Sequence, residues 1–157
     1  MTLLKWIAFG TVMTVSMSAF AATKEIVVKA TVSEILDLEK AGGGSIGAMS
    51  LPFNAGQEKL TPAKQSVTIK SNSFNSKVKV TLQSAAVLTS GSNTIPLKVS
   101  LGGKAITTTG VVFNADDVNG ADRKAKSMDL EVGPATSDRA SSGDYQGKIV
   151  LVLTHQP

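Results

Sequence analysis

The sequence has no cysteine and few histidines, aromatic residues or charges. Of 157 residues none is Cys, one is His and 4% are aromatic. The absence of cysteine excludes disulfide scaffolds, thiolate zinc sites, iron–sulfur clusters and cysteine nucleophiles. The single histidine, His155, excludes multi-histidine metal sites. Because no G-x-S-x-G motif accompanies it, we interpret His155 as a frayed terminal residue and not as part of a catalytic triad.

Charge is also sparse, at 18% of residues with a formal net charge of +4. No basic block is interleaved with aromatic residues, so nucleic-acid binding is not predicted. Residues 115–120, ADDVNG, resemble part of a calcium-binding loop but lack a carboxylate at the first position, and Lys126 stands at the twelfth. We therefore expect a solvated polar loop there. With no supported nucleophile–base pair or ligand cluster, we predict neither an enzyme nor a bound cofactor or metal.

The first 21 residues have the pattern of a secretory signal peptide. A basic start at Lys5 precedes an apolar, small-residue-rich run over residues 6–20. Ala19, Phe20 and Ala21 form a small-x-small cleavage site, which predicts cleavage between Ala21 and Ala22. A transmembrane anchor needs about 20 apolar residues, and polar residues interrupt this run. No later segment is long and apolar enough to span a membrane, so we expect an exported product without a mature membrane span.

The rest of the sequence alternates with a period of two, which is typical of half-buried strands. The alternating apolar sets are Ile26/Val28/Ala30/Val32, Val67/Ile69, Val78/Val80/Leu82, Leu97/Val99/Leu101, Met128/Leu130/Val132 and Tyr145/Gly147/Ile149/Leu151/Leu153. Residues 35–40 are a candidate helical turn, and Gly102-Gly103 is a candidate tight turn. Many short strands with frequent turn signals predict a single all-β domain, an antiparallel sandwich.

The first alternating run, over residues 26–32, begins close to the predicted mature N-terminus. A strand in this position either pairs within its own sheet or pairs with an exposed sheet edge of another molecule, as in donor-strand complementation. The periodicity of the sequence does not distinguish these two arrangements.

Four segments together resemble the major pilins of the colonisation-factor-antigen type, the alpha-fimbriae of the alternate chaperone–usher pathway, to which cable pilin is related. These segments are residues 22–38 (ATKEIVVKATVSEILDL), 77–82 (KVKVTL), 95–110 (IPLKVSLGGK followed by TTTG) and 142–154 (SGDYQGKIVLVLT). The order and spacing of the segments carry the resemblance, which spans nearly all of the mature chain. Ser33-Glu34 stands where family members usually have Asp-Pro, so no role of that proline is carried over.

The resemblance implies an immunoglobulin-like β-sandwich that lacks its last strand. In that arrangement residues 1–21 are the signal peptide, 22–34 the donor-strand extension and 35–157 the pilin domain. The donor side chains are Ile26, Val28, Ala30 and Val32. The accepting groove, which also pairs with the chaperone, is bordered by Tyr145, Gly147, Ile149, Leu151 and Leu153, although Val150 and Val152 leave the choice of face open.

The function implied is that of the major structural subunit of an adhesive fimbrium, located on the cell surface after export through the periplasm. The implied partners are identical subunits, a periplasmic chaperone, an outer-membrane usher and a tip adhesin. Two alternatives remain: a self-sufficient periplasmic β-sandwich that binds a ligand, and a minor or tip pilin of the same system. A tip adhesin needs a second, receptor-binding domain, for which the chain is too short.

Overall fold

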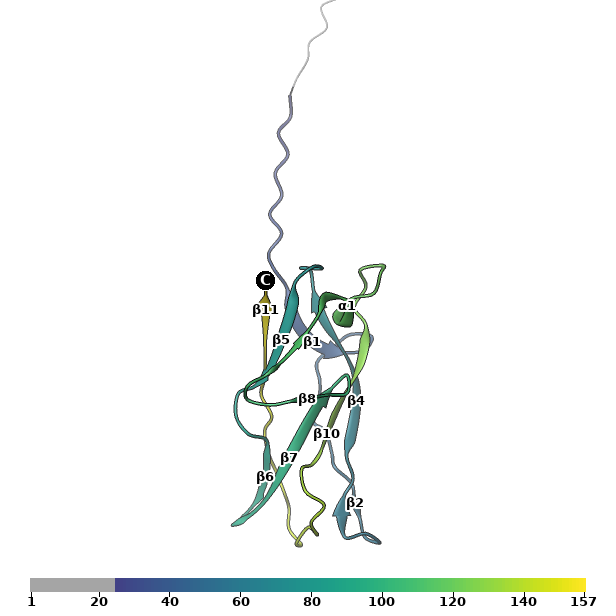
Figure 1. The fold of residues 1–157 in the computed structure, drawn as a ribbon, viewed down its shortest axis with the longest axis vertical. Coiled ribbons are helices and arrows are strands. Elements are labelled where there is room, and N and C mark those ends of the chain that lie inside the picture. The colour runs from purple at the N-terminus through teal and green to yellow at the C-terminus, as the bar shows by residue number, and fades with distance from the viewer. Residues whose placement is uncertain (1–24) are drawn as a thin grey trace, which may run out of the picture. The chain divides into compact units, whose positions relative to one another are not determined.

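The computed structural model describes residues 25–157 (Figure 1). The predicted signal peptide and its cleavage site at Ala19, Ala21 and Ala22 lie outside the described residues. The chain divides between Val32 and Ser33 into two units.

The first unit is described from residue 25 to residue 32 and contains no helix or strand there. Its apolar side chains are exposed, with Ile26 at 75%, Val28 at 86% and Val32 at 82%. The strand expected over residues 26–32 is therefore absent from the isolated chain. The physical reason is that a strand is stabilised by pairing with a neighbouring strand, and residues 25–32 pair with none.

The second unit is built almost entirely of antiparallel strands. Its elements are β1 (Leu36–Lys40), β2 (Phe53–Asn54), β3 (Lys59–Leu60), β4 (Ala63–Ser71), β5 (Lys77–Leu82), β6 (Val87–Ser90), β7 (Asn93–Leu101), β8 (Lys104–Ile106), β9 (Val111–Phe113), α1 (Ala115–Val118), β10 (Ser127–Pro134) and β11 (Leu151–Gln156). The predicted all-β antiparallel fold is confirmed.

The strands form two principal sheets and one small hairpin. The larger sheet has the order β1-β4-β10-β7-β6, with β8 paired to β7, and the smaller has the order β11-β5-β9. Strands β2 and β3 form the hairpin. Within the described residues β1 therefore ends one sheet and β11 ends the other.

The alternation in the sequence accounts for the core between the two sheets. Val67 and Ile69 of β4 are fully buried, as is Val80 of β5. The remaining buried apolar residues are Val78, Leu82, Ala86, Val99, Leu101, Ile106, Phe113, Val118, Leu130 and Val132. The predicted turn at Gly102-Gly103 is confirmed: it joins the paired residues Leu101 and Lys104, and both glycines have positive φ, +54° and +78°, as a two-residue hairpin turn requires.

The expectations for residues 35–40 and for the closing run are wrong. Residues 36–40 form β1 instead of a helical turn, since they pair with β4 from Leu36↔Ser71 to Lys40↔Val67; tertiary pairing overrides the weak local helix preference. The closing run expected from residue 145 is a regular strand only from Leu151 to Gln156. Before Leu151, an isolated β-bridge between Gln146 and Thr89 pairs the chain with β6.

The polar segment expected to be a solvated loop contains the short helix α1, which packs into the core through Val118. Asp117 fixes the start of this helix: its Oδ2 accepts a hydrogen bond from the Asn114 N–H at 3.0 Å. The same oxygen lies 2.9 Å from the Lys104 Nζ. The hydrogen bond from Lys104, followed by that from the Asn114 backbone, lowers the pKa of the Asp117 carboxyl below its usual range.

Replacement of Asp117 by Asn should make stability less dependent on pH. A carboxyl with a lowered pKa in the folded state stabilises the fold at neutral pH, and this contribution is lost as the pH falls through the lowered pKa. We expect Asp117→Asn to be less stable than the wild type at about pH 7 and the difference to narrow at about pH 3, which lies below the pKa of about 3.9 of an Asp carboxyl in the unfolded chain. Urea unfolding midpoints at the two pH values measure this, with Asp116→Asn as the control. An equal difference in unfolding midpoint between Asp117→Asn and the wild type at both pH values would contradict the lowered pKa of Asp117.

Candidate functional site

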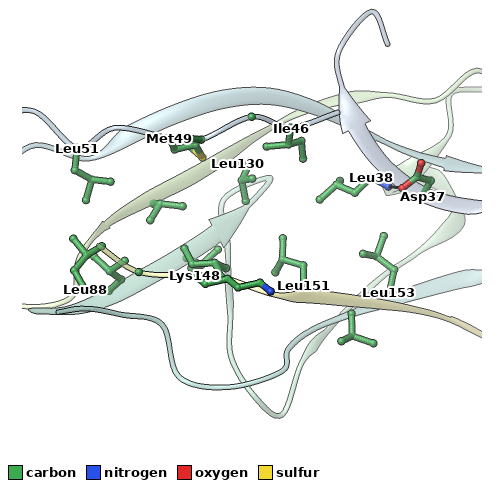
Figure 2. A pocket seen from close by; sticks show the side chains of 18 of the residues that line it. Asp37, Leu38, Ile46, Met49, Leu51, Leu88, Leu130, Lys148, Leu151 and Leu153 are labelled. Atoms are coloured by element: carbon green, nitrogen blue, oxygen red, sulfur yellow. Dashed lines mark hydrogen bonds between the residues drawn. The ribbon is translucent and has the colours of Figure 1, made fainter. Parts of the chain in front are cut away.

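An apolar groove of about 740 Å³ runs along β11 in the second unit. Figure 2 shows Leu88, Lys148, Leu151 and Leu153 on one side, facing Leu51, Met49, Ile46 and Leu38 on the other. The lining also includes Leu36, Asp37, Gly47, Ala48, Leu97, Val99, Leu130, Val132, Gly147, Ile149 and Val152.

The groove is an opening in the hydrophobic core. Val99 of β7 and Leu130 and Val132 of β10 are buried core residues that also line it. Around them, Leu38 and Leu151 pack against the core yet stay partly exposed. Large exposed apolar surfaces are uncommon on monomeric soluble proteins and mark places where another chain or ligand binds.

Two unpaired strand edges belong to this region. Within the described residues β11 pairs with β5 alone, and β1 pairs with β4 alone. An edge strand presents a row of free N–H and C=O groups that can pair with an additional strand. Since residues of both β1 and β11 line the groove, an extended segment lying in it would gain backbone partners as well as apolar contacts.

Charged side chains are few in the groove. Asp37 and Lys148 are its only charged lining residues, and no cluster of potential metal ligands occurs anywhere in the described residues. Among the helices of the described chain, none has the length and apolarity needed to cross a bilayer. The described lining of the groove is thus mainly apolar.

The structure brings four of the five predicted groove residues together. Gly147, Ile149, Leu151 and Leu153 line the groove, whereas the half-buried Tyr145 does not. Val152 also borders it, although its side chain is 42% exposed. Ile149, Leu151 and Leu153 pack against the core, as expected from their alternation.

Sequence reasoning missed the opposite wall of the groove. Ile46, Met49 and Leu51 come from the segment between β1 and β2, which is not a regular strand. Leu36 and Leu38 were not predicted as groove residues, because residues 35–40 were interpreted as a helical turn. The available signal was the series of apolar residues after the glycine-rich stretch, which is unusual for a solvated loop.

Comparison with known proteins places the chain among fimbrial subunits. The family model of the CS1 type fimbrial major subunit matches residues 22–154. The chain is 30% identical to a CFA/I fimbrial subunit of Escherichia coli O78:H11 (strain H10407 / ETEC), over 92% of this chain and 91% of that protein. It is 26% identical to a CS1 fimbrial subunit of Escherichia coli, over 88% of each chain.

A solved structure shares the fold. The CooA pilin subunit from enterotoxigenic Escherichia coli superposes with a TM-score of 0.66 at 22% sequence identity. The superposition covers 76% of this chain and 86% of the pilin.

Gly147 is required by close packing between the groove wall and β6. A Cβ at this position would lie 2.2 Å from the Val87 carbonyl oxygen and 3.0 Å from Leu88 Cδ2. Because the first of these atoms belongs to the backbone, the clash is relieved only if the wall and β6 separate. Gly47, on the opposite wall, has nothing within 4 Å of the same position.

We expect Gly147→Ala to destabilise the folded domain by about 1–3 kcal/mol, the usual cost of overpacking. Gly47→Ala is the matched control, since both residues line the groove, and it should change stability by less than about 0.5 kcal/mol. Urea unfolding midpoints of the purified proteins measure both effects. Equal midpoints for the two variants would show that the wall and β6 do not approach as closely as described.

Proposed function

The chain belongs to the CS1 type fimbrial major subunit family, and we propose that its copies join by donor-strand exchange. As a member it is a structural subunit of surface fimbriae and not an enzyme. In the proposed exchange, the extension 22–34 of one copy supplies the donor strand, and its residues 26–32 occupy the apolar groove along β11 of the next. The observation that carries the proposal is an apolar groove beside unpaired strand edges.

The donor segment has the chemistry that the groove needs. Ile26, Val28, Ala30 and Val32 alternate along it, so they would share one face of a strand. Burial of an aliphatic side chain of this size contributes about 1.5–3 kcal/mol. The exposure of these side chains in the single chain is therefore an unfavourable state that insertion into a neighbour would relieve.

The lengths of donor and groove also agree. The run from Ile26 to Val32 has seven residues, whose six steps span about 20 Å in a strand. The groove wall from Gly147 to Leu153 also has seven residues. One donor segment is thus long enough to line this wall without remainder.

The proposed contact explains why the assembly would be a fibre. Donor segment and groove are different surfaces, so each copy would offer both to two different neighbours. Such a head-to-tail contact leaves a free donor at one end and a free groove at the other, and it produces an open filament when the rotation between copies does not close a ring.

Export makes a temporary occupant of the groove necessary. Before polymerisation, the groove and the β11 edge expose apolar surface and unpaired backbone groups, which favour aggregation. We propose that a periplasmic chaperone pairs with β11 and is replaced by the donor segment at an outer-membrane usher. A tip adhesin would accept the donor segment of the subunit placed next to it.

The main alternative is a self-sufficient β-sandwich that binds a small ligand. The volume of about 740 Å³ lies within the range of ligand pockets. Such pockets contain several convergent polar groups, whereas only Asp37 and Lys148 are charged among the described lining residues. This alternative predicts a stable monomer in the absence of a chaperone.

Val28→Asp should block polymerisation, because burial of an unpaired carboxylate in the groove would cost about 3–5 kcal/mol. Since each ~1.4 kcal/mol is a tenfold change in an equilibrium constant, we expect polymer to fall below roughly one-tenth of the wild-type amount. Heat-labile ladders on gels, after co-expression with the cognate chaperone, measure this. Removal of residues 22–33 should have the same effect and leave the chaperone complex intact.

Thr31→Asp is the matched control, because Thr31 lies on the opposite face of the predicted donor strand. Its polymers should form at the wild-type level. Undiminished ladders from Val28→Asp and from the truncated chain would refute donor-strand exchange.

A further inference from the structure

The N-terminal end of the second unit is held by the side chain of Asn72. The Ile35 backbone N–H donates to Asn72 Oδ1 at 2.8 Å. The Asn72 Nδ2 donates in turn to the Ser33 carbonyl oxygen at 2.7 Å. One side-chain amide therefore satisfies a donor and an acceptor two residues apart along the same backbone, as a neighbouring strand would.

The register of β1 explains why a side chain performs this role. The last pair between β1 and β4 is Leu36↔Ser71, so the next residues in register would be Ile35 and Asn72. Strand β4 ends at Ser71, and its backbone then turns toward β5. The Asn72 side chain replaces the pairing groups that the backbone no longer offers.

Glu34, between the two bonded residues, is held separately. Its Oε1 accepts a hydrogen bond from the Ser73 hydroxyl at 2.8 Å and lies 3.2 Å from His155 Nδ1. The expectation that His155 is a frayed terminal residue is wrong. His155 lies in β11 and pairs with Val78 of β5, and its side chain is only 17% exposed. Asn72 and Ser73, in the turn between β4 and β5, thus attach positions 33–35 to the domain by hydrogen bonds.

We propose that Asn72 is a positioning residue that fixes where the free donor segment ends. This inference rests on the proposed donor-strand exchange. With positions 33–35 attached, the free segment ends at Val32, which is also where the chain divides into its two units. Because Val32 is itself a proposed donor residue, no slack chain remains between the donor strand and the domain it comes from.

Release of the clamp would lengthen the connection between subunits. Three freed residues add up to about 10 Å of extended chain. Adjacent subunits would then be joined by a looser segment, while the donor strand and the groove that accepts it stay unchanged. The clamp therefore sets the stiffness of the fibre and leaves the strength of each strand insertion unaltered.

The test compares Asn72→Ala with Asn75→Ala, a control in the same turn whose side chain is exposed. Hydrogen exchange of the Ile35 amide is measured on the full-length mature subunit in its chaperone complex and in fimbriae. We expect exchange in Asn72→Ala to be at least about five-fold faster and the control to match the wild type. Asn72→Asp, which keeps the acceptor for Ile35 N–H, should restore most of the protection.

The second measurement is the persistence length of the fimbriae by electron microscopy. Asn72→Ala fibres should bend more easily and dissociate at the wild-type temperature. Unchanged exchange of the Ile35 amide would overturn the clamp, and unchanged bending despite faster exchange would overturn its role in the joint. Failure of donor-strand exchange is detected separately, because hydrogen exchange of the Ile35 amide in the chaperone complex does not depend on polymerisation.

Discussion

The fold depends on an open seam between its two sheets. Strands β1 and β11 end their respective sheets, and the core residues between them border a groove instead of a closed interior. Exposure of this apolar lining to water is unfavourable, and the unpaired backbone edges can pair with a further strand. Under the proposed exchange, a donor segment in the seam would cover the lining and pair with the edges.

Under the proposed donor-strand exchange, the division of the chain into a compact domain and a preceding apolar segment would separate two properties of the fibre. The groove and the donor side chains would govern how strongly one copy holds its neighbour. The attachment of residues 33–35 by Asn72 would govern how closely the neighbour is held to the domain. Different residues would then set the durability and the flexibility of the fimbrium.

Strict alternation in the sequence was sufficient to predict β4, β5, β7 and β10, because their alternate apolar residues face the core between the two sheets. It was insufficient where pairing or packing outweighs local pattern. Residues 36–40 became a strand because β4 offered an edge, and the chain before Leu151 lost its regularity where Gly147 approaches β6. The groove wall formed by Ile46, Met49 and Leu51 depends on tertiary contacts that no periodicity reports.

The absence of native cysteine allows a direct test of strand exchange by paired cysteines. Facing residues on adjacent strands are close enough for a disulfide, so Val28→Cys is combined in turn with Ile149→Cys, Leu151→Cys or Leu153→Cys, and with the exposed Thr154→Cys as control. The account predicts that oxidised fimbriae of at least one groove pair run as covalent multimers on denaturing gels. Fimbriae that combine Val28→Cys with Thr154→Cys should give no covalent multimers. Disulfides formed only within single chains would contradict it, because they would show that each copy fills its own groove.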